Sequence, residues 1–310
     1  MKIIFFGTSN FAVKPLEILH KEFGIFAVFT QEDKPAGRGR KLTPSPIKKK
    51  ALELGISVYQ PEKLDFDTIS KIKDINPDFI IVVAYGKILP EEILNLPKYY
   101  ALNLHPSLLP KYRGAAPINW AIMNGEKYTG ISIIKMTKEL DAGDILYQEK
   151  VEIGEEEDAK TLSERLSQIG GEALKKVIPL CLEGKISLIP QDENLATYAP
   201  KLKKEDGLIN WEEKGEKIKN KVRGLIPWPC AYSYLKGKMI KILKVSVIYE
   251  KASFSPGTIV LADKKRGILV SASDSLIKIE KLQPEGRKVL SWKEYLVGLR
   301  EDIRYLKFEE

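Results

Sequence analysis

The chain has 310 residues, a net charge of +8 and 44% hydrophobic residues, a composition typical of a folded protein with more than one domain. It has two cysteines, far apart, and only two histidines, so we expect neither a disulfide framework nor a bound metal. The N-terminal apolar run breaks at Gly7, and no later run is long enough to cross a membrane. A cytoplasmic protein without membrane contact is therefore expected.

The first 189 residues alternate strand-like apolar runs with helical patterns. Strands are expected at residues 3–6, 25–30, 57–59, 79–84 and 101–105, and helices at 11–23, 47–54, 66–75 and 159–182. Strands separated by helices favour a doubly wound, mainly parallel α/β sheet. Such sheets bind their ligands at the carboxyl ends of the strands.

The pattern changes after residue 189. Residues 190–206 are polar and contain two prolines, which is typical of a linker. From 207 to 310 we expect a helix at 215–224 and short strands at 231–235, 239–248, 257–262, 268–272 and 276–282. Short strands without intervening helices predict a small β-barrel or sandwich.

The basic surplus of the chain lies in its C-terminal third. From residue 200 on there are 24 Lys and Arg against 15 Asp and Glu, a net charge of +9, so the rest of the chain is close to neutral. Two interpretations remain open: a lysine-rich solvated surface, or a surface for a polyanion such as RNA.

The stretch Asp33–Lys48, DKPAGRGRKLTPSPIK, is a long basic loop. Its length and its cations, among them Arg38, Arg40 and Lys41, favour contact with phosphates. The alternative is a loop whose charges are merely solvated.

One histidine, in the run ALNLHPSLLP, follows an expected strand. His105 and Asn103 are two residues apart, so their side chains leave the same face of the strand, at the end where such sheets place their chemistry. An asparagine amide can donate to an oxyanion and an imidazole can manage a proton. LDAGD supplies two carboxylates, Asp141 and Asp144, that could orient the imidazole. Together, Asn103, His105 and a carboxylate indicate proton transfer during a reaction at a carbonyl group.

NLHPSLLP, YRGAAPI (residues 112–118) and LDAGDIL (residues 140–146) closely resemble motifs of the formyltransferases that use 10-formyltetrahydrofolate. The resemblance implies a Rossmann-like catalytic domain over residues 1–189. It also implies that Asn103, His105 and Asp141 are the catalytic trio. Ser107, Leu108, Leu109 and Pro110 would then line the folate site. Whether His105 acts as a general base or stabilises an oxyanion stays open.

The basic loop, VVAYGKILP and the C-terminal region narrow the resemblance to the members that formylate methionyl-tRNA. They imply transfer of a formyl group from the co-substrate 10-formyltetrahydrofolate to the α-amino group of methionyl initiator tRNA, for translation initiation. The OB-like barrel of residues 207–310 would bind the tRNA, and Arg38, Arg40 and Lys41 would contact its acceptor end. We expect a monomer. The alternatives are another formyltransferase or hydrolase that uses this folate, or a non-catalytic RNA-binding protein.

Overall fold

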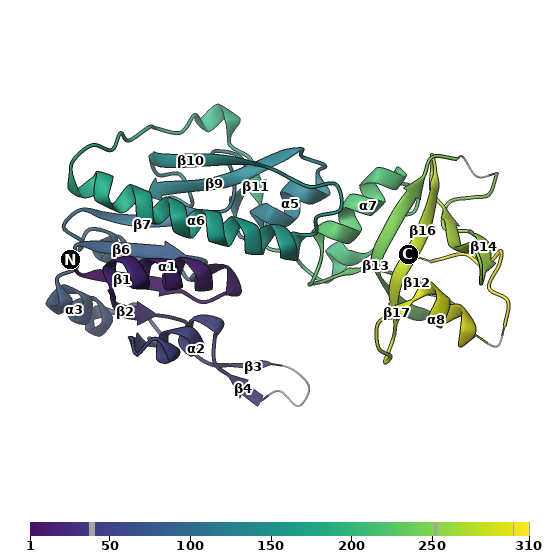
Figure 1. The fold of residues 1–310 in the computed structure, drawn as a ribbon, viewed down its shortest axis with the longest axis horizontal. Coiled ribbons are helices and arrows are strands. Elements are labelled where there is room, and N and C mark those ends of the chain that lie inside the picture. Colours follow the sequence, from purple (N-terminus) through teal and green to yellow (C-terminus); the bar gives the residue numbers. More distant parts are fainter. Residues whose placement is uncertain (37–40, 251–252, 300, 310) are drawn as a thin grey trace. The chain divides into compact units, whose positions relative to one another are not determined.

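The apolar runs of the N-terminal part form one seven-stranded sheet in the computed structural model of the chain (Figure 1). The strand order is β10-β9-β7-β6-β1-β2-β5. The strands are β1 (Ile3–Gly7), β2 (Ile25–Phe29), β5 (Ser57–Tyr59), β6 (Phe79–Val83), β7 (Tyr100–His105), β9 (Tyr128–Lys135) and β10 (Ile145–Glu152). Neighbours from β5 to β7 pair in parallel, whereas β9 is antiparallel to both β7 and β10. The predicted doubly wound, mainly parallel sheet is confirmed.

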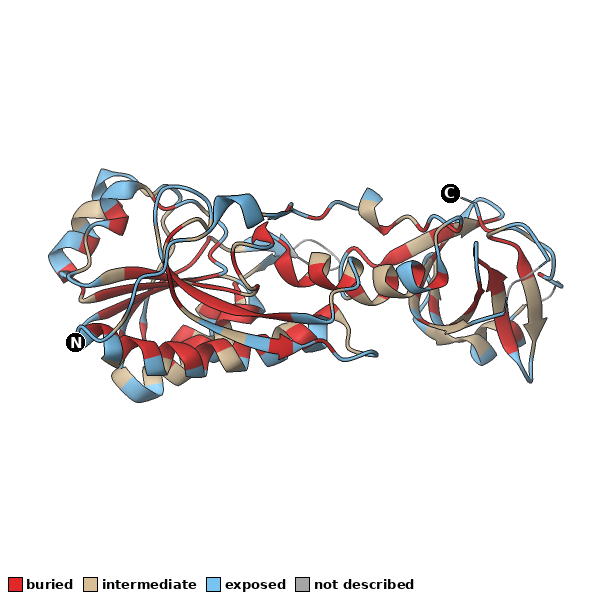
Figure 2. Ribbon diagram, turned by 90° about the horizontal axis from the view of Figure 1, so that it is seen from above, coloured by how far each residue is buried: buried red, intermediate tan, exposed pale blue. Residues whose placement is uncertain are grey.

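Helices cover both faces of this sheet, because its inner strands are apolar on both sides. The helices are α1 (Val13–Phe23), α2 (Pro46–Glu53), α3 (Phe66–Ile75), α4 (Glu91–Leu94) and α6 (Ala159–Leu182). A further helix, α5 (Pro117–Met123), groups almost entirely with the C-terminal part of the chain. Ile4 and Phe6 of β1 share a buried cluster with α3 and α4. On the other face, Leu104 of β7 packs against Gly170 of α6, and the next glycine of α6 packs against α1. Figure 2 shows the buried residues concentrated along these strands.

The structure describes residues 1–36, 41–250, 253–299 and 301–309, which group into two units. The first unit is formed by the described residues of 1–117, 128–152 and 163–200. The second is formed by 118–127, 153–162 and the described residues from 201 on. The domain boundaries expected from the sequence, 1–189 and 207–310, stay predictions. In the described part of the chain, no helix is long and apolar enough to cross a membrane.

The second unit contains an antiparallel sheet that curls around an apolar core. The elements are α7 (Gly215–Gly224), β12 (Ala231–Leu235), β13 (Lys238–Ile248), β14 (Ile259–Asp263), β15 (Gly267–Ser271), β16 (Leu276–Pro284), β17 (Leu290–Ser291) and α8 (Trp292–Val297). The sheet order is β12-β13-β16-β15-β14, with β17 beside β16. Trp211 is stacked on Phe308 inside this core, with its indole N–H donating to Ser233.

The segment 305–309 joins the two edge strands of this second sheet. Tyr234 of β12 exchanges two backbone hydrogen bonds with Glu309, and Ile259 of β14 exchanges two with Tyr305 and Leu306. Paired edges leave fewer free backbone groups than open ones, which stabilises the barrel and protects its edges. The predicted OB-like barrel thus takes the form of an antiparallel sheet closed by a late segment of the chain.

The stretch expected to be a linker contains ordered structure. A 3₁₀ turn at Glu193–Leu195 is followed by β11 (Tyr198–Ala199), which pairs in parallel with β8 (Arg113–Gly114). In the basic loop, β3 (Lys34–Ala36) and β4 (Lys41–Thr43) form a two-stranded ribbon. Neither pairing follows from the local sequence pattern, since each strand has only two or three residues.

Leu104 of β7 leaves no room for a side chain at Gly170 of α6. A Cβ atom added at Gly170 would lie 3.1 Å from Cγ of Leu104 and closer still to its methyl groups. Gly170→Val is therefore expected to lower the free energy of unfolding by about 1–3 kcal/mol through overpacking. Urea denaturation measures this change. Gln168→Val, on an exposed position of the same helix, is the control for the helix propensity of valine. Equal losses in the two variants would contradict the packing argument.

Candidate active site

Asn103 and His105 lie on β7, at the carboxyl end of the sheet. The alternation of strand side chains places both on one face, while Leu102 and Leu104 point to the other and are buried. Asn103 is paired with Val82 of β6 and Ile134 of β9, so the central strands fix its position. His105 is 4% exposed, and its backbone is level with Ser132 of β9.

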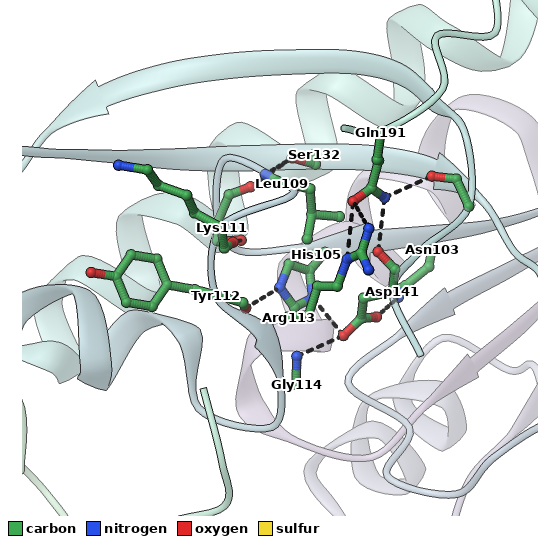
Figure 3. Close-up of polar contacts among 12 residues, drawn as sticks. Asn103, His105, Leu109, Lys111, Tyr112, Arg113, Gly114, Ser132, Asp141 and Gln191 are labelled. Carbon is green, nitrogen blue, oxygen red and sulfur yellow. Dashed lines mark hydrogen bonds and ion pairs between the residues drawn. The ribbon is translucent and has the colours of Figure 1, made fainter. Parts of the chain in front are cut away.

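Asp141 approaches these two residues from the loop after β9. Its backbone has a φ of +52°, an uncommon left-handed conformation for an aspartate. Its Oδ1 accepts a hydrogen bond from Asn103 Nδ2 at 3.1 Å, and its Oδ2 accepts one from the backbone N–H of Gly114 at 2.9 Å. The same Oδ2 lies 3.5 Å from Nδ1 of His105 (Figure 3). The structure thus brings the three expected residues together, with Asp141 rather than Asp144 facing the imidazole.

The second ring nitrogen of His105 faces a backbone carbonyl. Nε2 lies 2.9 Å from the carbonyl oxygen of Tyr112, which only accepts hydrogen bonds, so Nε2 carries a proton. Nδ1 faces the carboxylate of Asp141, which is also an acceptor when ionised. The two ring nitrogens thus face a backbone carbonyl on one side and a carboxylate on the other.

The segment Ser107–Pro110 is fixed by Ser132 of β9. The Ser132 hydroxyl donates to the carbonyl of Ser107 at 2.6 Å and accepts from the backbone N–H of Leu109 at 3.1 Å. Ser107 and Leu109 are buried, whereas Leu108 and Pro110 are partly exposed. The surface that this segment offers to a ligand is therefore that of the Leu108 and Pro110 side chains.

Of the three residues expected to contact tRNA, the structure describes Lys41. Arg38 and Arg40 fall outside the described residues. Lys41 is an exposed residue of β4, and within the described parts of the chain no interaction joins it to Asn103, His105 or Asp141. At the base of the ribbon, Lys48 forms an ion pair with Asp33 at 2.9 Å.

A buried arginine next to the site was not among the expected functional residues. Arg113 is 2% exposed, and its guanidinium donates to Gln191 and to both carboxylate oxygens of Glu193 (Figure 3). The hydrogen bond to Glu193 raises the pKa of Arg113, and the same bond lowers the pKa of Glu193. Arg113 is part of the YRGAAPI motif, but Gln191 and Glu193 lie in a polar stretch that carries no periodic signal.

The side-chain donors of Asn103 and His105 and the carboxylate of Asp141 lie close together. Within the described ranges, no three His, Cys, Asp or Glu side chains cluster closely enough to hold a metal ion. Asn103 uses one of its two amide hydrogens on Asp141, which leaves the second for another acceptor. An amide and an imidazolium side by side can stabilise a developing oxyanion.

Known proteins resemble both parts of the chain. The family described as formyl transferase matches residues 1–178, and the family described as formyl transferase, C-terminal domain, matches residues 201–300. A methionyl-tRNA formyltransferase of Dictyoglomus thermophilum is 46% identical over 309 residues, covering 98% of each chain. One from Thermodesulfovibrio yellowstonii is 49% identical over 298 residues, covering 96% of this chain and 95% of the relative.

Solved structures of lower identity share the fold. WlaRD, a sugar 3N-formyl transferase solved with dTDP and 5-N-formyl-THF, has a TM-score of 0.68 at 20% identity, covering 93% of this chain and 99% of that one. HypX from Aquifex aeolicus, solved with tetrahydrofolic acid, has a TM-score of 0.64 at 19% identity and covers 97% of this chain but 48% of its own. With both parts of the sequence matched and two relatives nearly half identical over almost their full lengths, the chain belongs to the formyl transferase family.

Proposed function

We propose that this chain transfers the formyl group of 10-formyltetrahydrofolate to the α-amino group of methionyl initiator tRNA. The observation that carries the proposal is the convergence of Asn103, His105 and Asp141 at the carboxyl end of the sheet. The near full-length likeness to methionyl-tRNA formyltransferases supports the acceptor, and the family membership supports the formyl donor.

The reaction forms one C–N bond and breaks another. The neutral α-amine attacks the formyl carbon, and the carbonyl oxygen becomes an oxyanion. When the bond from carbon to N10 of the folate breaks, the amine loses a proton and N10 gains one, so tetrahydrofolate and the formylated amine are released. The protein must therefore stabilise negative charge on oxygen and assist one proton transfer.

Asn103 and His105 are suited to stabilise the oxyanion. Asn103 has a spare amide hydrogen, and each donor of this kind is worth roughly 3 kcal/mol in enzymes where one has been removed. The proton on Nε2 of His105 favours electrostatic stabilisation over general-base action, since the ring holds no lone pair toward Tyr112. In this assignment the Tyr112 carbonyl holds the Nε2–H until the substrate oxygen replaces it.

Asp141 orients and charges the imidazole. Its carboxylate is held by Asn103 and by the Gly114 N–H, so it keeps its position when the substrates bind. A carboxylate so placed can also receive and pass on the proton of the amine through water.

For the donor, we assign the segment Ser107–Pro110 to one wall of the folate site. Leu108 and Pro110 supply apolar surface, which suits a flat ring. The bonds of Ser132 to the segment hold that wall rigid before the ligand binds.

For the acceptor, we assign the basic loop and the C-terminal barrel to tRNA binding. The net charge of +9 from residue 200 on favours contact with phosphates. Lys41 is exposed for such contact, whereas Lys34 and Lys48 are occupied by Gln31 and Asp33. In this proposal the enzyme works as a cytoplasmic monomer.

Substitution of the trio tests the chemistry. His105→Ala and Asp141→Ala are each expected to lower the single-turnover rate of formylation about 100-fold or more, with little change in donor affinity, because the lost interactions act on the transition state. The assay uses charged initiator tRNA and 10-formyltetrahydrofolate. His20→Gln is the control, since His20 accepts a bond from the Ile25 backbone at the end of α1, away from the trio. Rates near wild type in either alanine variant would refute the assignment.

Substitution in the basic loop tests the tRNA assignment. Arg38→Ala and Lys41→Ala are expected to lower kcat/KM with methionyl-tRNA but hardly at all with a small amine acceptor. Each should also reduce the slope of log affinity against log salt by up to about one unit, because one phosphate contact is lost. Lys185→Ala, an exposed cation after α6, is the control. Equal losses with both acceptors would place the loop at the formyl transfer site instead, and no loss would leave its charges merely solvated.

A further inference from the structure

A glutamine from the segment after α6 binds the backbone of the loop that carries Asp141. Nε2 of Gln191 donates to the carbonyl of Asp141 at 2.8 Å and to the carbonyl of Gly143 at 2.7 Å (Figure 3). The two bonds span the turn in which Asp141 takes its left-handed conformation. We propose that Gln191 is a positioning residue that fixes the carboxylate of Asp141, and that Arg113 sets its orientation. This inference rests on the proposed role of Asp141 in formyl transfer.

Arg113 determines which way the Gln191 amide faces. Nε and Nη2 of Arg113 donate to Oε1 of Gln191 at 3.2 and 2.8 Å. A guanidinium has only donors, so the amide must turn its oxygen toward Arg113 and its NH₂ toward the loop carbonyls. Arg113 is itself held, because Nη1 and Nη2 also donate to the carboxylate of Glu193. The result is a directed chain of contacts from Arg113 through Gln191 to the backbone of Asp141.

β9 fixes the far end of the loop, whereas Gln191 binds the backbone carbonyls at and near Asp141. Gly143 packs so closely on β9 that an added Cβ atom would lie 1.7 Å from the carbonyl oxygen of Lys135. The Lys135 N–H is bonded to the carbonyl of Asp144, which fixes the far end of the turn. Gln191 binds two further carbonyls of the turn, those of Asp141 and Gly143. A left-handed aspartate is disfavoured in isolation, so hydrogen bonds from outside the turn are needed to hold it.

The expected consequence of losing these bonds is a displaced carboxylate rather than an unfolded protein. Asp141 would still reach Asn103 and Gly114, but its distance to His105 would be free to change. A displacement of about 1 Å at a reacting centre can lower a rate on the order of 100-fold. Among the described residues, the side-chain hydrogen bonds of Gln191 join it to backbone carbonyls of the loop and to Arg113. Its loss should therefore affect turnover more than the binding of either substrate.

The test compares Gln191→Glu with Gln168→Glu. In the first variant the carboxylate still accepts from Arg113 but cannot donate to the two carbonyls. We expect kcat to fall about 10- to 100-fold, with KM for each substrate within about threefold and a melting temperature close to that of the wild type. Gln168→Glu makes the same chemical change on the exposed face of α6 and should leave kcat unchanged. Gln191→Leu, which adds no charge, should repeat the loss of kcat.

A second measurement does not depend on activity. The chain has two histidines, so selective ¹³C labelling of their Cε1 atoms gives two resonances, which His20→Gln assigns. At a fixed pH, the His105 resonance should shift in Gln191→Glu and Gln191→Leu, while that of His20 stays in place. An unchanged kcat, a loss confined to KM, or an unshifted His105 resonance would each overturn the inference. If the wild-type chain formylated no methionyl-tRNA, the proposed function would fail, and the His105 resonance would still decide whether Gln191 positions Asp141.

Discussion

The site depends on where one carboxylate is held. Asp141 accepts hydrogen bonds from Asn103 on β7 and from the Gly114 backbone, and it faces the imidazole of His105. Asn103 and His105 lie on one strand and Gly114 lies on another, so the carboxylate ties two segments of the chain to its own loop. Its own backbone conformation is unfavourable, and it persists because β9 and Gln191 hold the loop around it. At this point the fold keeps an unfavourable backbone conformation, and that conformation places the carboxylate beside His105.

The sheet explains why such a loop is needed. β9 runs antiparallel to β7, so its carboxyl end at Lys135 lies level with Leu102, three residues before His105 at the end of β7. A chain leaving β9 therefore points away from His105 and must turn back to bring a carboxylate to it. The loop of residues 136–144 makes this reversal, and the bond from the Lys135 N–H to the Asp144 carbonyl closes it. The glycine at 143 is required because the returning chain touches β9 directly.

Much of the fold could be predicted from the sequence, because most elements have a clear period. The helices at 66–75, 159–182 and 215–224 occur with the expected bounds, and the strands of the parallel sheet agree to within about two residues. The pairing of β8 with β11 and of β3 with β4 was not predictable, since such short strands are defined by their distant partners. α5 and β10 were also not identified from the pattern.

The candidate site was predictable to a similar degree. Alternation along β7 alone places Asn103 and His105 on one face, and the family resemblance supplies Asp141. Periodicity cannot choose between Asp141 and Asp144, because the choice depends on how the loop turns back. Gln191 binds backbone carbonyls, and Nε2 of His105 faces the backbone carbonyl of Tyr112. A backbone carbonyl is present at every residue, so the sequence does not indicate either contact. Interactions of this kind become visible only in three dimensions.

The closure of the second sheet has a consequence for biosynthesis. The edge strands β12 and β14 are joined by residues 305–309, which emerge from the ribosome after every other strand of that sheet has been made. Until then, the nascent sheet has two open edges and an incomplete core, since Phe308 is missing from its place against Trp211. Open edges invite pairing with other chains. The interval between synthesis of β14 and of residue 309 is thus the period in which this part of the chain most needs protection from aggregation.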